Sequence, residues 1–268
     1  MIINGKVLAD EILAGLKKEI QKLPRRLTVG AVLVGKNAAS ESFLKQKAKV
    51  AEILGINFNL FKISSKISNE KLCKEILRLN ENKNINGIIV QLPLPKHIET
   101  KKILNIINPK KDIDALSAKP QVLAPTVEAV KFVFNKYRIN YKNKNILIVG
   151  RGRLVGQPIF KWLTAQEQRL KGKIKIIDIN QKNQLPKLAL KADIIISGVG
   201  KVGLINGNMI KKGAILIDFG FSRKNGKIFG DFEFNSCVKK AKLITPVPNG
   251  MGPIMVAMLF RNLFKCLQ

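Results

Sequence analysis

The chain has 268 residues, of which 46% are hydrophobic, and its formal net charge at pH 7 is +30. This length allows one large or two modest domains, and the hydrophobic content excludes a globally disordered chain. No apolar run reaches the about 18 residues of a membrane span, and residues 1–23 lack the basic start and continuous apolar core of a signal peptide. A cytoplasmic protein without membrane partners is therefore expected.

The few cysteines, the single histidine and the excess of basic residues limit which functions the chain can have. Cys73, Cys237 and Cys266 lie far apart and predict neither a metal site nor a disulfide framework, and the sole histidine, His97, is expected at the surface. The 48 Lys+Arg against 18 Asp+Glu suit a polyanion partner such as nucleic acid. However, the lysines are spread along the whole chain, and 6% aromatic residues supply few base-stacking platforms. Nucleic-acid binding is thus the less favoured alternative, and an acidic small substrate suits the charge equally well.

Strand-like apolar runs alternate with helical patterns, which predicts an α/β fold with parallel sheets. In the first half, a strand-like start leads into an amphipathic helix. The elements expected next are strands at 27–35, 57–63 and 85–95 and helices at 40–55, 69–82 and 98–107.

A second series of elements follows a loop at 108–118. It comprises helices at 125–137 and 155–163, strands at 143–150, 173–179, 193–199 and 214–220, and a last helix at 254–267. We therefore expect an N-terminal α/β domain over 1–120 and a second, Rossmann-like domain with a parallel sheet over 121–249. The C-terminal segment, 250–268, is expected to complete the first domain.

The helix at 40–55 carries three lysines with different surroundings. On a helical wheel, Lys47 falls within the apolar stripe that contains Phe43, whereas Lys45 and Lys49 fall on the opposite face. Lys45 and Lys49 are expected to be solvated. Two interpretations of Lys47 stay open: a snorkelling side chain whose stem covers apolar surface, or a partly buried amine that works as an acid or base.

Polar residues near the end of a first-half strand are further candidates. Gln91 ends a buried strand just before "LPLP", at the edge where α/β proteins bind ligands. The loop "KKDID" contains Asp112 and Asp114. Asp112 is expected to be solvated, whereas Asp114 lies nearer the apolar Ala115 and Leu116.

The segment "ILIVGRGRLVGQP" (146–158) runs from a strand through Gly150, Gly152 and Gly156 into a helix. Small residues let the backbone approach a pyrophosphate, and a helix N-terminus favours its negative charge. The spacing is G-x-G-x-x-x-G rather than G-x-G-x-x-G, so a tight turn without a ligand is the alternative. The strands that follow favour the dinucleotide domain.

Two residues near this segment favour opposite cofactors. Asp178, at the end of the next strand, suits a ribose 2′-hydroxyl and would repel a 2′-phosphate, whereas Arg151 in the glycine loop suits that phosphate. An aspartate without a ligand role is the alternative for Asp178. Both NAD and NADP therefore stay open.

Seven motifs together resemble one enzyme family. They are "GIIVQLPLP", "KKDID", "GRGRLVGQP", "ADIIISGVGKVGLI", "KKGAILIDFG", "GDFEF" and "ITPVPNGMGPIMVAML". In this order they resemble the methylenetetrahydrofolate dehydrogenase/cyclohydrolase family over essentially the whole chain. The resemblance implies a two-domain enzyme of one-carbon metabolism that oxidises 5,10-methylenetetrahydrofolate to the 5,10-methenyl form with NADP or NAD. Hydrolysis of that product to 10-formyltetrahydrofolate, a homodimer, a catalytic, folate-binding role for the domain over 1–120 and NAD(P) binding by the domain over 121–249 are also implied.

The resemblance implies roles for individual residues. Lys47 matches the family's catalytic lysine, Gln91 the glutamine that hydrogen-bonds it, and Asp114 the acid that holds the pterin ring. The other residues implied to contact the folate are Ser40, Phe43, Leu92, Pro93, Pro248, Gly252 and Pro253. Those implied to contact the cofactor are Gly150, Arg151, Gly152, Val155, Gly156, Pro158, Asp178, Val199 and Gly200.

The chain departs from the family pattern at several positions near the implied site. It has Phe43 for the usual tyrosine, Gly152 for serine, Ala115 and Asn249 for glycine, and Met255 for threonine. Asp178 and Ile179 stand where the family often has histidine and serine. These departures leave open a diverged member that retains only the dehydrogenase step.

Overall fold

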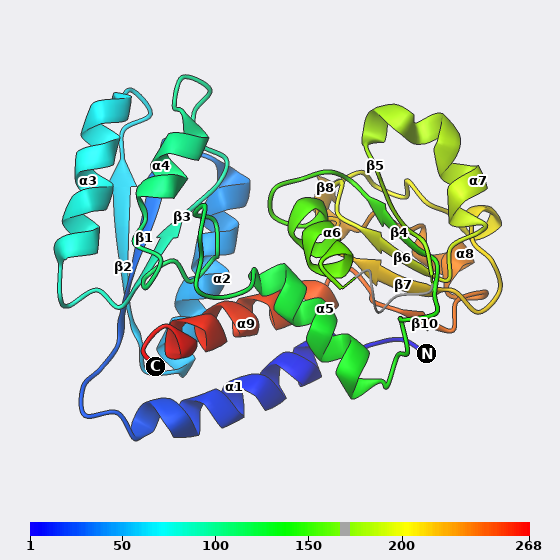
Figure 1. The fold of residues 1–268 in the computed structure, drawn as a ribbon, viewed down its shortest axis with the longest axis horizontal. Coiled ribbons are helices and arrows are strands. Elements are labelled where there is room, and N and C mark those ends of the chain that lie inside the picture. The colour runs from blue at the N-terminus through cyan, green and yellow to red at the C-terminus, as the bar shows by residue number, and fades with distance from the viewer. Residues whose placement is uncertain (167–171) are drawn as a thin grey trace. The chain divides into compact units, whose positions relative to one another are not determined.

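The computed structural model describes residues 1–166 and 172–268 and divides into two compact units (Figure 1). One unit comprises Asp10–Pro125 and Val256–Gln268 and is called the Lys47 unit below. The other comprises Met1–Ala9 and Thr126–Met255 and is called the glycine-loop unit. Among the described residues, no helix combines the length and apolarity that a bilayer crossing requires.

A three-stranded parallel sheet in the order β2-β1-β3 is the centre of the Lys47 unit. Its strands are β1 (Thr28–Val34), β2 (Asn57–Ile63) and β3 (Gly87–Val90). The helices that lie wholly in this unit are α2 (Ala38–Ile53), α3 (Asn69–Glu81) and α4 (Thr100–Ile106). The helix α1 (Gly5–Gln21) ends in this unit, and α9 (Met251–Lys265) enters it at Val256.

The strands of this sheet differ in how far they are buried. The central strand β1 is buried at every position, as expected for a parallel strand covered on both faces, whereas the edge strand β2 is partly exposed throughout. Helices α3 and α4 pack on the sheet through an apolar cluster that includes Leu72, Ile76, Ile103 and Leu104.

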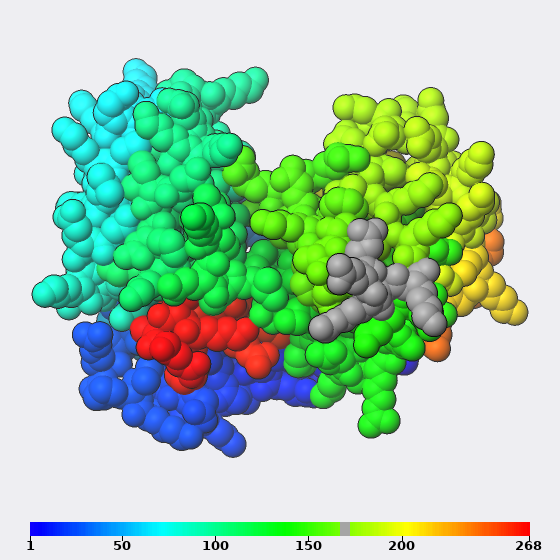
Figure 2. All heavy atoms as spheres, in the orientation of Figure 1, coloured from blue at the N-terminus to red at the C-terminus, as the bar shows by residue number. Residues whose placement is uncertain are grey.

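The C-terminal helix is fixed to the loop region of the Lys47 unit by one buried side chain. Asn262 on α9 donates through Nδ2 to the backbone oxygens of Ile113 (3.1 Å) and Leu123 (2.8 Å). In Figure 2 the red end of α9 correspondingly lies against the green segment that precedes helix α5 (Pro125–Lys136).

The glycine-loop unit contains a five-stranded parallel sheet in the order β10-β7-β6-β4-β5. Its strands are β4 (Ile146–Val149), β5 (Ile174–Ile177), β6 (Ile194–Ser197), β7 (Ile215–Asp218) and β10 (Leu243–Ile244). The chain moves from β4 to β5 on one side and then returns to β6 on the other. The strand order therefore reverses beside β4, and ligands of open α/β sheets bind at the carboxyl ends of strands at such a point.

Helices and short elements complete this unit. They are α5, α6 (Gly156–Thr164), η2 (Ile179–Gln184), α7 (Leu185–Ala189), η3 (Gly207–Met209), the antiparallel pair β8 (Ser222–Lys224) and β9 (Lys227–Phe229), and α8 (Phe234–Cys237). The N-terminal residue Ile2 pairs with Ile244 of β10 through an isolated parallel bridge.

The α/β fold class with parallel sheets is confirmed, and the seven strands expected from residue 27 onward are present, whereas the strand-like N-terminal start forms only the isolated bridge at Ile2. Most are shorter than expected: the apolar run at 85–95 forms a strand only over Gly87–Val90, because Pro93 and Pro95 lack backbone donors. The strands β8, β9 and β10 were not predicted, because they are too short for a periodic pattern to reveal.

Candidate active site

Lys47 lies on the inner face of α2. This helix begins after Asn37, whose side chain accepts a hydrogen bond from the Ser40 backbone and caps the N-terminus. The Lys47 side chain is 12% exposed, whereas Lys45 and Lys49 are exposed. The helical wheel predicts this arrangement.

Two polar groups hold the Lys47 amine. Its Nζ lies 3.3 Å from Oδ2 of Asp114 and 3.5 Å from Oε1 of Gln91. Gln91 is buried immediately after β3, and its Nε2 donates to the Leu92 backbone oxygen at 2.9 Å. That bond directs Oε1 toward the lysine, so the amide has a defined orientation.

The loop that presents Asp114 is built around Asp112, which is fully buried rather than solvated. The expectation for Asp112 was therefore wrong. Its carboxylate accepts hydrogen bonds from the backbone of Leu116 (3.1 Å) and Ser117 (2.7 Å), and burial raises the pKa of Asp112. The carboxylate replaces water for these backbone donors and thereby shapes the loop that carries Asp114.

Other residues expected at the folate site surround this lysine. Ser40 is buried and donates from Oγ to the Leu92 oxygen at 3.3 Å, so α2 and the segment after β3 are joined beside Lys47. Phe43 is half-buried one turn before Lys47, and Pro93 is exposed after Leu92.

The remaining residues expected to contact folate belong to the glycine-loop unit. Pro248 precedes α9, and Gly252 and Pro253 lie in the first turn of that helix.

The glycine loop has the backbone shape that a phosphate group requires. Gly150 follows β4 with φ +101°, a conformation that favours glycine. Gly156 begins α6, and a Cβ there would lie 1.8 Å from the Gly150 oxygen. Gly152 has space around it, so a side chain at that position meets no obstacle. The residue that caps α6, Val155, provides no side-chain hydrogen bond, which leaves the helix N-terminus available to an anion.

A second loop packs against the glycine loop. Residues 198–201 follow β6, and a Cβ on Gly198 would lie 2.6 Å from Cγ1 of Val155. Val199 and Gly200 are in this loop, and Pro158 is in the first turn of α6. The structure thus brings the expected cofactor residues of both loops to the carboxyl edge of the sheet, and this arrangement fits a dinucleotide.

Arg151 and Asp178 already have partners within the chain. Arg151 donates from Nη2 to the Ile176 oxygen at 3.1 Å, which places the arginine over the end of β5. Asp178 caps η2: its Oδ1 accepts from the Asn180 backbone at 3.1 Å, and Gln181 bonds the Asp178 backbone in return. Asp178 lies at the expected strand end and Arg151 reaches that end from the glycine loop, but the Asp178 carboxylate has a structural role there.

Three residues that support the nucleotide loops were missed. Thr126 on α5 donates from Oγ1 to the Leu154 oxygen at 2.8 Å and thereby holds the glycine loop. Ser197 and Asp231 are buried and bonded to each other at 2.7 Å beside the second loop. For Asp231, the sequence offers one signal, an acid between the apolar residues of "FGDFEF". That pattern does not identify the groups that the acid binds.

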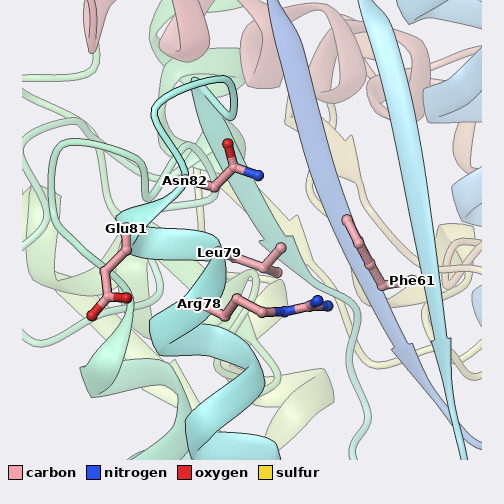
Figure 3. Close-up of a pocket in the computed structure, with 5 residues that line it drawn as sticks. All are labelled: Phe61, Arg78, Leu79, Glu81 and Asn82. Atoms are coloured by element: carbon pink, nitrogen blue, oxygen red, sulfur yellow. The ribbon is translucent and has the colours of Figure 1, made fainter.

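A hollow of about 380 Å³ lies between the end of α3 and β2. Its lining residues are Phe61, Arg78, Leu79, Glu81 and Asn82 (Figure 3). The Arg78 side chain extends toward Phe61, whereas Glu81 points away. None of the expected site residues lines this hollow, and within the described residues no group of His, Cys, Asp or Glu is placed to hold a metal ion.

Comparisons with known proteins agree with both parts of this site. Residues 3–114 match the catalytic domain of the tetrahydrofolate dehydrogenase/cyclohydrolase family, and residues 124–268 match its NAD(P)-binding domain. The bifunctional protein FolD of Rickettsia canadensis is 40% identical, over 100% of this chain and 96% of that protein.

Solved structures give the same result. The bifunctional FolD methylenetetrahydrofolate dehydrogenase/cyclohydrolase of Campylobacter jejuni is 33% identical, with a TM-score of 0.92, over 99% of this chain and 98% of that one. The Trypanosoma brucei enzyme, solved with NADP and an inhibitor, is 28% identical, with a TM-score of 0.91, over 99% of this chain and 96% of that one. The chain therefore belongs to the tetrahydrofolate dehydrogenase/cyclohydrolase family.

Proposed function

We propose that this protein oxidises 5,10-methylenetetrahydrofolate to 5,10-methenyltetrahydrofolate and hydrolyses that product to 10-formyltetrahydrofolate. The observation that carries this proposal is the Lys47 amine held between Gln91 and Asp114. The family match over both domains and the glycine loop at the carboxyl edge of the sheet support it. A cytoplasmic homodimer is part of the proposal and rests on the family resemblance.

Lys47 is the acid/base group of the hydrolytic step in this proposal. An amine in its neutral form takes a proton from water and makes the water a better nucleophile. Asp114 accepts hydrogen bonds from the amino-pyrimidine edge of the pterin, which weakens its hold on the Lys47 ammonium. Gln91 keeps the Lys47 Nζ in position while Asp114 turns to the pterin, because the Gln91 amide is itself fixed by its bond to the Leu92 oxygen. Ser40, Phe43, Leu92, Pro93, Pro248, Gly252 and Pro253 are proposed to complete the folate surface.

The nicotinamide cofactor, when bound, supplies the hydride acceptor for the oxidation. Gly150, Gly152, Gly156 and Pro158 are proposed to seat its pyrophosphate at the start of α6, where backbone N–H groups and the helix dipole favour negative charge. Val155, Val199 and Gly200 are proposed to contact it from the two packed loops. Arg151 and Asp178 face the end of β5 and are proposed to set the choice between NADP and NAD.

A dehydrogenase without hydrolytic activity is the second candidate. Phe43, one turn before Lys47, provides an aromatic face but no hydroxyl to the surroundings of the amine. If hydrolysis depends on that hydroxyl, only the oxidation survives. The two half-reactions, followed separately, distinguish this candidate from the bifunctional enzyme.

The role of Lys47 is tested by comparing Lys47→Ala with Lys45→Ala. Both variants remove a lysine from the same helix, but only Lys47 contacts Gln91 and Asp114. We expect Lys47→Ala to lower the rate of methenyl hydrolysis by about a hundredfold or more, because general acid–base groups contribute 10²–10⁴. Lys45→Ala is expected to hydrolyse at the wild-type rate. Equal loss in both variants would contradict a specific role for Lys47, and circular dichroism verifies that each variant is folded.

A further inference from the structure

Two buried aspartates in the glycine-loop unit have no part in the chemistry described above. Asp218 is the last residue of β7 and is 3% exposed, and Asp231, just after the β8–β9 pair, is 0% exposed. A buried carboxylate destabilises a fold unless hydrogen bonds compensate for the lost water. The bonds that these two groups accept therefore indicate what they hold in place.

Asp231 binds the loop that follows β6. Its Oδ2 accepts from Ser197 Oγ and from the Val199 backbone, both at 2.7 Å. Its Oδ1 accepts from the Lys201 backbone, also at 2.7 Å. One carboxylate thus satisfies three donors within five consecutive residues of the chain. These three bonds compensate the carboxylate for the water that it loses on burial.

Asp218 and two glycines fix the position of Asp231 in turn. Asp218 accepts from the backbone of Asp231 at 3.2 Å and of Phe232 at 3.0 Å. A Cβ on Gly220 would lie 2.3 Å from Oδ1 of Asp231, and a Cβ on Gly230 would lie 2.2 Å from Oδ2 of Asp218. Both carboxylates therefore occupy space that any side chain at these glycines would take.

The loop bound by Asp231 is the same loop that packs against the glycine loop. Gly198 contacts Val155, and the Gly198 oxygen would lie 3.0 Å from a Cβ on Gly150. A displacement of residues 198–201 would therefore reach the segment proposed to seat the pyrophosphate.

We infer that Asp231 is a positioning residue that preforms the cofactor-binding loop at 198–201 before the cofactor arrives. The inference rests on the proposed function, because it takes that loop as part of the dinucleotide site. If the loop is already ordered in the folded protein, cofactor binding does not have to supply the free energy of ordering it. Asp231 can therefore strengthen cofactor binding without touching the cofactor.

Asp231→Asn tests this inference with the smallest change in shape. An amide offers one acceptor oxygen and an NH₂ group, so at least one backbone donor of the loop would face another donor. We expect faster hydrogen exchange at the Val199 and Lys201 amides of the cofactor-free protein, by about tenfold or more. We also expect the Kd for NADP or NAD, measured by calorimetry, to rise about tenfold to a hundredfold.

Thr245→Val is the matched control. The Thr245 hydroxyl is buried and accepts from the Asp218 backbone at 2.7 Å, so its loss weakens the same region without removing a bond to the loop at 198–201. This variant is expected to keep the wild-type Kd and the wild-type exchange at Val199 and Lys201. Ser197→Ala, which removes a single donor to Asp231, replaces Asp231→Asn if that variant does not fold, and we expect its Kd to rise about threefold.

The outcomes separate the inference from the proposed function. Faster exchange together with weaker binding in Asp231→Asn, and neither in Thr245→Val, supports the positioning role. An unchanged Kd in a folded Asp231→Asn overturns it, as does an equal loss in Thr245→Val. If the wild-type protein binds neither dinucleotide, the proposed function fails first and the inference fails with it.

Discussion

Ala115 and Asn249 adopt left-handed backbone conformations, with φ of +55° and +69°. Both stand where the family resemblance implies glycine, which enters this region without steric cost. Asparagine is the next most tolerant residue there, whereas alanine is strained by contact between Cβ and its own backbone. The backbone shape beside Asp114 is thus retained although the glycine is lost.

Ala115→Gly is therefore expected to stabilise the protein. Relief of left-handed strain contributes about 1–2 kcal/mol, and the greater freedom of glycine in the unfolded chain offsets about 0.4–1 kcal/mol of it. The net gain in the free energy of unfolding is about 0.5–1 kcal/mol, measurable by denaturant titration. Ala118→Gly, at an exposed position of the same loop where φ is not positive, is the control and should not stabilise the protein. A loss of stability in Ala115→Gly would contradict the strain argument.

The individual site residues differ in how far the sequence predicted them. Periodicity along α2 identifies the inner face on which Lys47 lies, because neighbours on one helix are fixed by local geometry. The approach of Asp114 to Lys47 depends on a loop shaped by the buried Asp112, whose burial no local pattern indicates. For the same reason, Asp231 was found only through its contacts with a loop distant in sequence.

At the scale of elements, the junction of β5 and η2 fixes the position from which we propose that Asp178 acts on the cofactor. The aspartate directly follows the strand and caps the next turn, so its carboxyl group is held at the carboxyl edge of the sheet. Arg151 reaches the end of the same strand through the Ile176 oxygen. The two side chains therefore lie at one end of β5, where we propose that a 2′-phosphate and a 2′-hydroxyl are distinguished.

Asp178→Ser removes the charge and keeps a side-chain oxygen that caps the turn. We expect the ratio of kcat/KM for NADP to that for NAD to rise about tenfold, because repulsion of a 2′-phosphate is lost. Asp193→Ser is the matched control, since Asp193 precedes β6 at the opposite edge of the sheet and pairs with Lys211. An unchanged ratio in Asp178→Ser would mean that Asp178 does not face the ribose.

The sequence predicted the long helices and strands but not the shortest strands. The helix α3 and the strand β1 show clear periodicity or a continuous apolar run, and each was located to within a residue. The two-residue strand β10 pairs with β7 and with the N-terminal residue Ile2, contacts that exist only after folding. Tertiary pairing, and not local propensity, defines such elements.

At the scale of the whole molecule, the buried pair in the glycine-loop unit makes stability depend on pH. Burial and then the neighbouring Asp231 raise the pKa of Asp218 from 3.8 to about 7. The folded protein therefore retains a proton that the unfolded chain has lost between about pH 4 and 7. Asp218 consequently contributes stability at low pH that is lost as the pH rises through this range.

Asp218→Asn is expected to remove this dependence. The free energy of unfolding of the wild type should fall with rising pH more steeply than that of the variant, by up to about 1.4 kcal/mol per pH unit. All other titratable side chains, including the single histidine, are common to both proteins, so the difference between the two slopes reports on this site. Denaturant titrations between about pH 5 and 7 measure both slopes. Parallel curves would show that Asp218 does not titrate in this range, even if the variant is less stable at every pH.

The net charge of +30 also acts on the whole molecule. Exposed lysines occur in both units, including Lys45 and Lys49 in one and Lys175 and Lys187 in the other. The positive electrostatic potential of lysines distributed over both units attracts anionic ligands in general and weakens as salt is added. Such a field would favour association with a negatively charged folate or dinucleotide.

The central claim is that one chain performs both reactions, and the most direct test is a paired assay of the purified wild-type protein. Oxidation of 5,10-methylenetetrahydrofolate is followed with NADP and NAD in parallel, and hydrolysis of 5,10-methenyltetrahydrofolate is followed without cofactor. We predict turnover in both assays, which would mean that Lys47 works beside Phe43 without a neighbouring tyrosine. Oxidation without hydrolysis would contradict the bifunctional account and leave a dehydrogenase, and no turnover in either assay would contradict the proposed function as a whole.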